Sequence, residues 1–402
     1  MRRSLSARRA AIAVAGAAAL GLTLLPLSIP AGAAAAPAPS GGTWTIQPSP
    51  NQPGAASSQL DSVSCVKGGS CAAVGTYFTG TGVPEHQFTL ALERTGTTWA
   101  REPTPAIKGV GYSVLNGVSC TSASSCIAVG FTVGAKRLSP PIHTLAERWN
   151  GTSWTVQAMP ALNDVSLEAV SCPTPAFCLA VGSQARGGGS PLAEVWNGTS
   201  WSQLTAPNPH AENGSSFTAV DCAAAGRCEV TGDYDYADVA QSVIAYGLNG
   251  TSWTGQKQVN PAGGNEFNSN TGVSCTSVTA CTSAGAWSPS FSLGLAERWN
   301  GTAWSRQKLP RPAKSVTDEL LGVSCPAAAA CTAVGDSSAS QNGNPAAPMA
   351  MTWNGTTWQL ATTADPAGGG GFRSVSCTAP GTCVGVGVGG GTNTLVEVSP
   401  AG

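Results

Sequence analysis

The stretch Val118-Ser119-Cys120-Thr121-Ser122-Ala123-Ser124-Ser125-Cys126-Ile127-Ala128-Val129-Gly130 decides the fold, because close variants of it occur seven times in the chain. In every copy the second cysteine lies six positions after the first, and the seven pairs account for all 14 cysteines. The pairs are Cys65/Cys71, Cys120/Cys126, Cys172/Cys178, Cys222/Cys228, Cys275/Cys281, Cys325/Cys331 and Cys377/Cys383. Since one short spacing recurs and no cysteine is left over, the chain is an array of one repeated unit.

Each copy contains sequence for four short strands. In the second copy, two small and β-branched segments carry the cysteines, and two further segments, 144–149 and 154–157, flank Asn150-Gly151. Asn-Gly is a strong hairpin signal because both residues tolerate the positive φ of a type I′ turn. We therefore expect each copy to form a four-stranded antiparallel meander.

The two ends of the array indicate how the copies assemble. The cysteines recur every 50 to 55 residues, close to the kelch period, and a meander of this size must pack on its neighbours. Residues 43–47 match the fourth strand of the unit, whereas the last copy stops after its third strand, residues 394–398. The sequence therefore predicts an all-β, seven-bladed β-propeller of four-stranded antiparallel blades, closed by an N-terminal strand that completes the last blade.

The N-terminal segment has the pattern of a secretory signal peptide. Four arginines within the first nine residues precede an apolar stretch over 10–27 and a small-residue run over 31–36. We assign 1–36 to the signal peptide, 37–42 to a short linker and 43–402 to the propeller. A retained membrane anchor is the weaker alternative, because prolines interrupt the apolar stretch. The blades are expected near residues 59–101, 113–157, 166–204, 216–256, 270–307, 318–360, and 371–398 together with 43–47.

Export determines how the cysteines are interpreted. In an oxidising compartment an even set of cysteines forms disulfides, and each pair here would close a small loop across a hairpin. Zinc is the alternative, but structural zinc sites favour two to four intervening residues, whereas this spacing has five and the chain has only three histidines. We expect seven disulfides and a secreted, extracellular protein without a stable membrane anchor once the signal is removed.

The charge balance excludes one class of partner. Without the four signal arginines the chain keeps 16 basic and 21 acidic side chains, a net charge of about −5. Only 10% of the residues are charged, and no block of like charge occurs. Nucleic acid is therefore not an expected partner, since its phosphates require a basic surface.

Two sets of repeated residues are expected to be structural. Tryptophans flank the Asn-Gly turns, and their bulk suits packing between diverging blades. Glutamates recur on the third strand, and since a catalytic acid is needed only once, we expect them to bond the backbone of a neighbouring blade. The tryptophans are Trp149, Trp154, Trp196, Trp201, Trp253, Trp299, Trp304, Trp353 and Trp358, and the glutamates are Glu93, Glu147, Glu194, Glu297 and Glu397.

The turn sequence resembles a known family pattern. Trp149-Asn150-Gly151-Thr152-Ser153-Trp154 and its copies are similar to the Asp-box, or BNR repeat, of sialidase-like propellers, which also marks the turn between the third and fourth strands. Asparagine here replaces the aspartate of that motif. In that family the box is a structural turn distant from catalysis, so the resemblance implies the architecture and transfers no active site.

A localised site is expected on the face that carries the variable loops. The disulfide hairpins and Asn-Gly turns occupy the other face, which the sequence predicts to be uniform and tight. Loops on a rigid scaffold commonly carry recognition, and these loops contain aromatic residues that the repeat does not require. The candidate ligand-binding residues are Trp287, Phe291, Tyr234, Tyr236, Tyr77 and Phe131, of which Trp287 is the first to test.

One loop is a weak candidate for a metal site. Asp233, Asp235 and Asp238 place three carboxylates within six residues, and Ca²⁺ prefers such oxygen ligands. No glycine follows to permit an EF-hand turn, so a solvated acidic loop is the favoured interpretation. Apart from this calcium possibility, no cofactor is expected.

These observations favour a secreted, non-enzymatic propeller that binds an extracellular carbohydrate or protein through its variable loop face. A glycoside hydrolase or lyase of sialidase-like type is one alternative, which requires unrepeated residues, such as Arg101, Arg137, Arg186 or Arg373, to converge on one face. A multivalent lectin with sugar sites between blades is the other. No catalytic residue is assigned from the sequence.

Overall fold

The computed structural model describes residues 42–400 apart from 81–85, 136–139, 185–188, 210–213, 237–239 and 262–266. These residues belong to one compact unit, 37–402, and their regular structure consists of β-strands alone. The predicted signal peptide, most of the linker and Asp238 lie outside the described residues. Within the described ranges, no helix of sufficient length and apolarity to cross a bilayer is present.

The strands form seven successive four-stranded units. The first three units comprise β2 (Ser57–Cys65), β3 (Cys71–Thr79), β4 (His86–Thr95) and β5 (Thr98–Glu102); β6 (Val110–Ser122), β7 (Ser125–Gly134), β8 (Ile142–Trp149) and β9 (Trp154–Val156); and β10 (Val165–Thr174), β11 (Phe177–Gln184), β12 (Ser190–Trp196) and β13 (Trp201–Leu204). The next three comprise β14 (Ser215–Ala224), β15 (Arg227–Tyr236), β16 (Ala240–Asn249) and β17 (Ser252–Gln256); β18 (Phe267–Ser277), β19 (Ala280–Ser288), β20 (Leu293–Trp299) and β21 (Trp304–Arg306); and β22 (Thr317–Ala327), β23 (Ala330–Ser338), β24 (Ala347–Trp353) and β25 (Trp358–Ala361). The seventh comprises β26 (Gly370–Ala379), β27 (Thr382–Gly389), β28 (Asn393–Val398) and, from the other end of the chain, β1 (Thr45–Ile46).

The first strand pairs with the last, as predicted. Thr45 lies opposite Val398 and Ile46 opposite Glu397 in an antiparallel ladder. Trp44 precedes this strand, is 2% exposed, and packs against Phe372 with ring centroids 5.6 Å apart. The seventh sheet therefore depends on both ends of the described chain.

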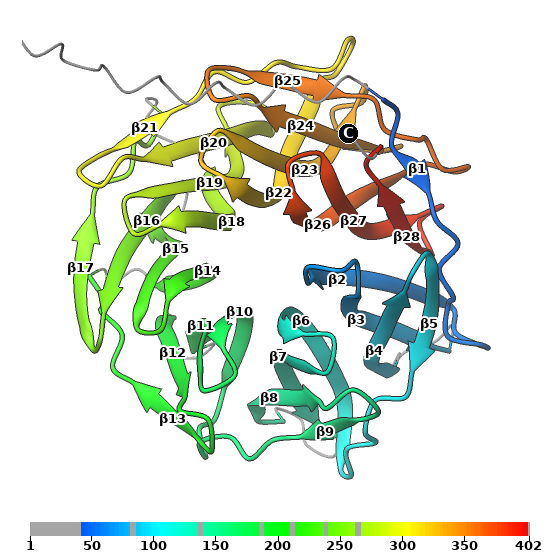
Figure 1. Cartoon of the computed structure of the whole chain (residues 1–402), viewed down its shortest axis with the longest axis vertical. Coiled ribbons are helices and arrows are strands. Elements are labelled where there is room, and N and C mark those ends of the chain that lie inside the picture. The colour runs from blue at the N-terminus through cyan, green and yellow to red at the C-terminus, as the bar shows by residue number, and fades with distance from the viewer. Residues whose placement is uncertain are drawn as a thin grey trace, which may run out of the picture. The chain divides into compact units, whose positions relative to one another are not determined.

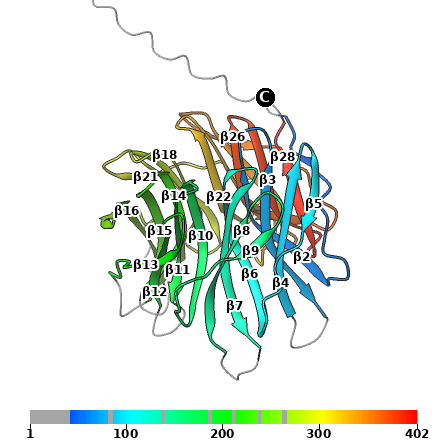
Figure 2. The same ribbon diagram turned by 60° about the horizontal axis from the view of Figure 1, so that its bottom comes forward.

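The units follow one another around a common centre (Figure 1), with the first strand of each innermost and the fourth outermost. A second view shows the sheets standing beside one another with their strands along the central axis (Figure 2). Each innermost strand contacts that of the next unit, and β26 also contacts β2. Hydrophobic side chains fill the spaces between units; for example, Val129 of the second unit packs with Leu167 and Trp196 of the third. Apolar burial between neighbours thus holds the array together.

The serine of the Val-Ser-Cys motif links neighbouring units. Its hydroxyl oxygen accepts a hydrogen bond from the cysteine N–H of the next unit, as in the 2.9 Å bond from the Cys120 N–H to Ser64 Oγ. The same link joins the last unit to the first, because the Cys65 N–H donates to Ser376 Oγ at 2.9 Å. In the fourth unit Asp221 replaces the serine and accepts from the Cys275 N–H at 2.6 Å. The motif therefore serves contacts between units as well as the disulfide within each unit.

All seven predicted disulfides are present, and each joins β-strands across a hairpin with Cα atoms 3.9 to 4.1 Å apart. We expect the Cys120→Ser/Cys126→Ser double variant to keep its fold but to unfold at a lower temperature. Removing one short loop constraint lowers the free energy of unfolding by about 2 kcal/mol. Thermal denaturation followed by circular dichroism measures this, and an unchanged melting temperature would contradict a stabilising role for this bridge.

The second cysteine of each pair is buried. The sequence places the bridges in hairpins on one face and does not predict this burial. Cys178 belongs to the apolar cluster that joins the second and third units, and Cys383 belongs to the cluster that joins the sixth and seventh. The Thr332 hydroxyl of the sixth unit lies 3.3 Å from Cys383 Sγ. These sulfurs therefore fill space between units in addition to closing hairpins. The buried second cysteines are Cys71, Cys126, Cys178, Cys228, Cys281, Cys331 and Cys383.

The predicted type I′ geometry of the Asn-Gly turn is wrong. Gly151 has a φ of 95°, but Asn150 has no positive φ, and the link between the paired Trp149 and Trp154 is four residues long. Asn150 Oδ1 instead accepts hydrogen bonds from the Thr152 N–H, the Thr152 hydroxyl and the Ser153 N–H at 2.8 to 3.0 Å. The asparagine side chain therefore organises the turn, and only the glycine needs the left-handed region.

Four of the five repeated glutamates are buried, namely Glu147, Glu194, Glu297 and Glu397, whereas Glu93 is half-buried. Glu297 Oε1 accepts a hydrogen bond from the Val259 N–H at 2.9 Å, and Glu397 Oε2 accepts one from the Ala364 N–H at 3.0 Å, each N–H belonging to the preceding unit. This confirms the structural interpretation for these two. Glu147 is fully buried, and neither carboxyl oxygen has a hydrogen-bond partner among the described residues. Burial raises the pKa of Glu147 to about 8 and of Glu194, Glu297 and Glu397 to about 7.

Candidate functional site

Every innermost strand is irregular at the same place, two to three residues before the valine of the Val-Ser-Cys motif. The ladder to the second strand shifts by one residue there, between Leu60 and Ser62 in the first unit and between Phe372 and Ser374 in the seventh. The corresponding shifts lie at Leu115/Gly117, Leu167/Ala169, Phe217/Ala219, Asn270/Gly272 and Leu320/Gly322. A bulge of this kind leaves one residue out of the ladder and re-aims its side chain, and bulges are common beside active sites.

The residue at the bulge varies among the units. In chain order the seven are Asp61, Asn116, Glu168, Thr218, Thr271, Leu321 and Arg373. Some hold the next innermost strand: Asn116 Nδ2 donates to the Leu167 carbonyl at 2.9 Å, and Thr271 Oγ1 donates to the Leu320 carbonyl at 2.7 Å. Three members are charged, Asp61, Glu168 and Arg373, and we call these three together with Asn116, which also contacts Glu168, the axial set.

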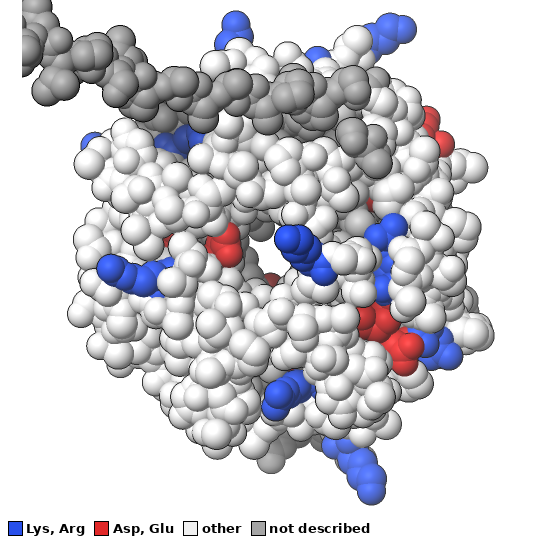
Figure 3. Space-filling model, viewed as in Figure 1, with Lys and Arg blue, Asp and Glu red and all other residues white. Residues whose placement is uncertain are grey.

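The axial set brings together charges from units distant in the sequence. Burial raises the pKa of Asp61 to about 6, while the positive charge of Arg373 lowers it and the negative charge of Glu168 raises it. Asp61 lies on the first unit and Glu168 on the third, so the charge of Glu168 acts on Asp61 past the intervening second unit. Asn116 Nδ2 donates to Glu168 Oε2 at 3.1 Å. In Figure 3 the face is sparsely charged, and acidic and basic atoms lie beside the hollow at its centre.

Two further carboxylates lie beside Arg373. Asp336 of β23 is opposite Glu319 of β22, and burial followed by the Glu319 charge raises the pKa of Asp336 to about 6, whereas Arg373 lowers it. A Cβ added to Gly371 of β26 would lie 2.9 Å from the Asp336 carboxylate, so glycine allows this close approach. Carboxyl groups that titrate near pH 6 can exchange protons at neutral pH, which is the property required for general acid and base chemistry.

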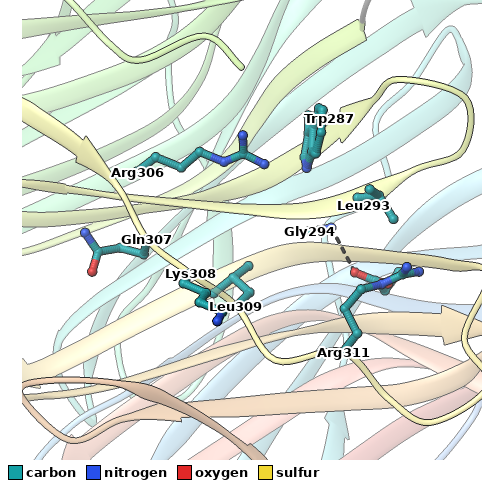
Figure 4. Close-up of a pocket in the computed structure, with 9 residues that line it drawn as sticks. Trp287, Leu293, Gly294, Arg306, Gln307, Lys308, Leu309 and Arg311 are labelled. Carbon is teal, nitrogen blue, oxygen red and sulfur yellow. Dashed lines mark hydrogen bonds and ion pairs between the residues drawn. The ribbon is translucent and has the colours of Figure 1, made fainter. Parts of the chain in front are cut away.

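A second candidate site is a groove around Trp287. This residue lies near the C-terminal end of β19, where the variable loops are found. The groove has a volume of about 440 Å³, and Leu293 and Leu309 complete its apolar lining. Figure 4 shows Arg306 extending from β21 toward the Trp287 ring, and its guanidinium carbon lies 4.3 Å from the ring centroid. The half-buried Trp287 therefore offers an aromatic surface next to a fixed positive charge.

The groove is positively charged. Arg306, Lys308 and Arg311 line it, with Asp318 as the acidic lining residue. Asp318 is occupied by its neighbours, because its Oδ2 accepts from Arg311 Nε at 2.7 Å and its Oδ1 accepts from the Gly294 N–H at 3.0 Å. Arg306 and Lys308 are left to face solvent and an incoming ligand.

The other predicted aromatics do not gather at this groove. Phe291 is 39% exposed in the turn between β19 and β20, whereas Tyr77 packs against Phe88 with centroids 5.5 Å apart. Tyr234 is half-buried and packs on the core of the fourth unit, and Phe131 is half-buried in the second unit. The Tyr236 side chain lies outside the described residues. Of the five candidates whose side chains are described, only Trp287 lines the groove.

The acidic loop of the fourth unit is partly described. Asp233 is 8% exposed and its Oδ1 accepts a hydrogen bond from Ser216 Oγ at 2.7 Å, while Asp235 is exposed. Asp238 lies outside the described ranges, within which no three histidine, cysteine, aspartate or glutamate side chains form a metal-binding group. Calcium binding here remains a prediction from the sequence.

Sequence reasoning named Arg373 but missed Asp61, Asn116 and Glu168. A signal for them was present: aligned on the Val-Ser-Cys motif, the position two before the valine carries a charged residue in three units and asparagine, threonine or leucine in the others, whereas the position after it is always glycine, alanine or serine. Its importance was not apparent from the sequence, because the alternation of side chains along a regular strand does not predict a bulge. Only the bulge turns the side chain at this position in a different direction from those of a regular strand.

Comparisons with known proteins support the fold. No protein-family model matches the chain, and no curated protein is similar to it in sequence. Among solved structures it is similar to Ycf48 bound to a D1 peptide, with a TM-score of 0.55 and 12% identity over 91% of this chain and 98% of that one. It is similar to Ycf48 from Cyanidioschyzon merolae, with a TM-score of 0.50 and 14% identity over 89% and 99% of the two chains. At these identities the likeness shows the β-propeller fold alone.

Proposed function

We propose that this protein is a secreted, closed seven-bladed propeller that binds an acidic extracellular carbohydrate in the Trp287 groove. The observation that carries the proposal is the combination of an accessible indole with Arg306 and Lys308 in one groove of about 440 Å³. Indole rings pack against the apolar faces of sugars, and arginine and lysine bind carboxylate or sulfate groups. A uronic acid or sulfated sugar presents both features.

Ring closure is supported by contacts between the two ends of the array. β1 completes the sheet of β28, the Cys65 N–H donates to Ser376, and the Val63 N–H donates to Ser374. The bond between Cys65 and Ser376 repeats the cysteine N–H link between the other neighbouring units, in which Asp221 replaces the serine once. The seven disulfides indicate an oxidising compartment. Secretion is further supported by the segment 1–36, which has the pattern of a signal peptide.

The multivalent lectin is disfavoured by the burial of the repeated tryptophans. Trp149, Trp154, Trp196 and Trp201 are 4 to 6% exposed, and each pair packs ring against ring with centroids 5.7 to 5.8 Å apart. Rings in this position fill the space between units, as expected. A single groove on the fifth unit accounts for carbohydrate binding without repeated sites.

Binding to a glycan array of acidic and neutral polysaccharides tests the proposal. We expect acidic glycans to bind, and Trp287→Ala to weaken binding about tenfold or more, a loss of about 1.4 kcal/mol or more. Arg306→Gln/Lys308→Gln should weaken binding to acidic glycans similarly, because their charge partners are removed. Phe131→Ala, in the second unit, and Arg101→Gln, in the first, are matched controls that should bind normally. Absence of binding to any acidic glycan, or full binding by Trp287→Ala, would refute the assignment.

A second candidate function is hydrolysis or elimination of a polysaccharide at the axial set. It is favoured by the convergence of unrepeated Asp61, Glu168 and Arg373 and by the pKa of Asp61 near 6. Release of reducing or unsaturated ends from a bound polysaccharide, lost in Asp61→Asn but retained in Phe131→Ala, would establish it. Binding without any cleavage would leave the protein as a binding propeller.

A further inference from the structure

The face that carries the disulfide hairpins is not uniform, contrary to the prediction from the sequence. A cavity of about 280 Å³ lies there between the fourth and fifth units. Glu229, Gly247 and Leu248 line it from the fourth unit, and Val278, Cys281 and Trp299 line it from the fifth. It is separate from both the axial set and the Trp287 groove.

The cavity arises where the fourth unit differs from the fifth. The third strand of the fifth unit carries Glu297-Arg298-Trp299, and the fourth unit has Tyr246-Gly247-Leu248 at the same positions. On the second strand, Glu229 stands opposite Gly247, whereas in the fifth unit Thr282 stands opposite Arg298. Relative to the fifth unit, the fourth therefore has a glycine in place of the arginine and a carboxylate in place of the threonine.

At the equivalent position between the fifth and sixth units, the space is filled by the side chain of Arg298. Its Nη1 donates to Thr282 Oγ1 at 3.2 Å and its Nη2 donates to the Ala328 carbonyl at 2.8 Å. Its guanidinium carbon lies 4.7 Å from the centroid of the Trp353 ring, and Nη1 is 3.8 Å from Cys331 Sγ. The guanidinium is thus held between a side-chain oxygen, a carbonyl, a sulfur and an indole face.

The equivalents of all four groups line the cavity between the fourth and fifth units. Glu229 takes the place of Thr282, Trp299 that of Trp353, and Cys281 that of Cys331, as the strand registers establish. Val278 takes the place of Ala328, since each lies three residues after the first cysteine of its unit. The groups that would contact a guanidinium are therefore present in this cavity, but the residue at the position of Arg298 is Gly247, which has no side chain to fill it.

Glu229 makes this cavity more suitable for a guanidinium group than Thr282 makes the equivalent space of the fifth unit. It is 5% exposed, its Oε2 accepts from Gln256 Nε2 at 3.0 Å, and its Oε1 is buried with no hydrogen-bond partner among the described residues. A buried carboxylate oxygen without a partner is costly, and a guanidinium supplies both the charge and the donors. We propose that this cavity binds the guanidinium group of an arginine, presented by a partner protein or as a small arginine derivative.

Calorimetric titration of the folded chain with N-acetyl-L-argininamide tests the proposal. We expect a dissociation constant of about 1 mM or lower, and at least a tenfold weaker constant for N-acetyl-L-citrullinamide, which has the same shape without the charge. Equal affinity for the two compounds would overturn the proposal. Free L-arginine separates the sources: comparable binding identifies a small molecule, and a preference for the blocked amide identifies a residue within a chain.

Two variants test the position of the site. Gly247→Arg introduces the arginine that the fifth unit carries at this position, Arg298. A Cβ there meets two side-chain atoms, Gln256 Nε2 at 3.0 Å and Glu229 Oε2 at 3.7 Å, so this variant should fold, melt at a higher temperature and bind no argininamide. Glu229→Gln should bind at least tenfold more weakly, while Glu194→Gln, which changes a buried glutamate of the third unit, should bind normally. Undiminished binding by Gly247→Arg would refute the site. Binding seen only in Arg227→Gln would also refute it, because the chain's own Arg227, which lines the cavity, would then be the occupant.

Discussion

Acidification from pH 8 to pH 5 is expected to raise the melting temperature of this protein. Glu147, Glu194, Glu297 and Glu397 are fully buried, and burial raises their pKa from 4.5 to about 7 or 8. In the unfolded chain these groups lose their protons near pH 4.5, whereas in the folded chain they keep them up to pH 7 or 8. The unfolded state is therefore favoured increasingly as the pH rises through this window.

The size of the effect follows from linkage between protonation and folding. A pKa that is higher by about 2.5 to 3.5 units in the folded state corresponds to about 3 to 5 kcal/mol less stability per group above its folded pKa. Below pH 4.5 both states are protonated and these groups contribute no pH dependence. Chemical denaturation at pH 5, 6, 7 and 8 measures the trend, and a free energy of unfolding that stays constant or rises with pH would contradict it.

A single substitution isolates one glutamate. Glu147→Gln should be more stable than the wild type at pH 8, because it removes the ionisable group, and should match it near pH 5. Thr155→Ala on β9, which changes an exposed side chain and no ionisable group, is the control and should leave the pH dependence of stability unchanged. An equal loss of stability by Glu147→Gln at both pH values would show that packing rather than ionisation governs this position.

Trp44→Ala is expected to destabilise the protein strongly although it lies just before a strand of two residues. Trp44 is 2% exposed and packs with Phe372, Val375 and Leu395 of the seventh unit and with Val334 of the sixth. Truncation of a buried tryptophan typically lowers the free energy of unfolding by about 3 to 5 kcal/mol. The neighbouring Gln47 side chain also accepts hydrogen bonds from Arg94 and Trp99 of the first unit, so displacement of this segment would loosen both sides of the junction.

Ile46→Ala provides the matched control on the same segment. Ile46 is 47% exposed, so its truncation removes little buried surface and should lower the free energy of unfolding by less than about 1 kcal/mol. Urea denaturation compares the two variants. Similar stabilities would show that the N-terminal segment does not anchor the seventh unit.

Much of the architecture was predictable because its signals are local. The cysteine spacing, the small β-branched strands and the Asn-Gly turns each act within about ten residues, and seven copies made the pattern unmistakable. The match between 43–47 and the fourth strand of the unit correctly predicted the pairing of β1 with β28. The type I′ turn was mispredicted because the Asn150 side chain, rather than a positive φ at asparagine, organises the loop.

The candidate sites were less predictable because their parts come from different units. Trp287 was identified from the sequence as an unrepeated tryptophan, but the cations beside it lie on β21 and in the connection that follows it. The cavity between the fourth and fifth units could be recognised only by comparing the surroundings of Gly247 and Arg298 in three dimensions. The role of Ser64 and its equivalents, which bind the next unit's backbone, was likewise invisible in a motif that read as a disulfide hairpin.

The sequence by itself determined the repeat, the strands, the disulfide pairing and the position of the chain's first strand, since periodicity and cysteine spacing are properties of short segments. Only the tertiary structure decided that the charges of Glu168 and Arg373 act on Asp61, since each residue lies at the bulge of a different innermost strand and Asp61 and Arg373 are over 300 residues apart in the chain. Convergence of this kind depends on how the sheets are arranged around the axis, and no local pattern encodes that arrangement.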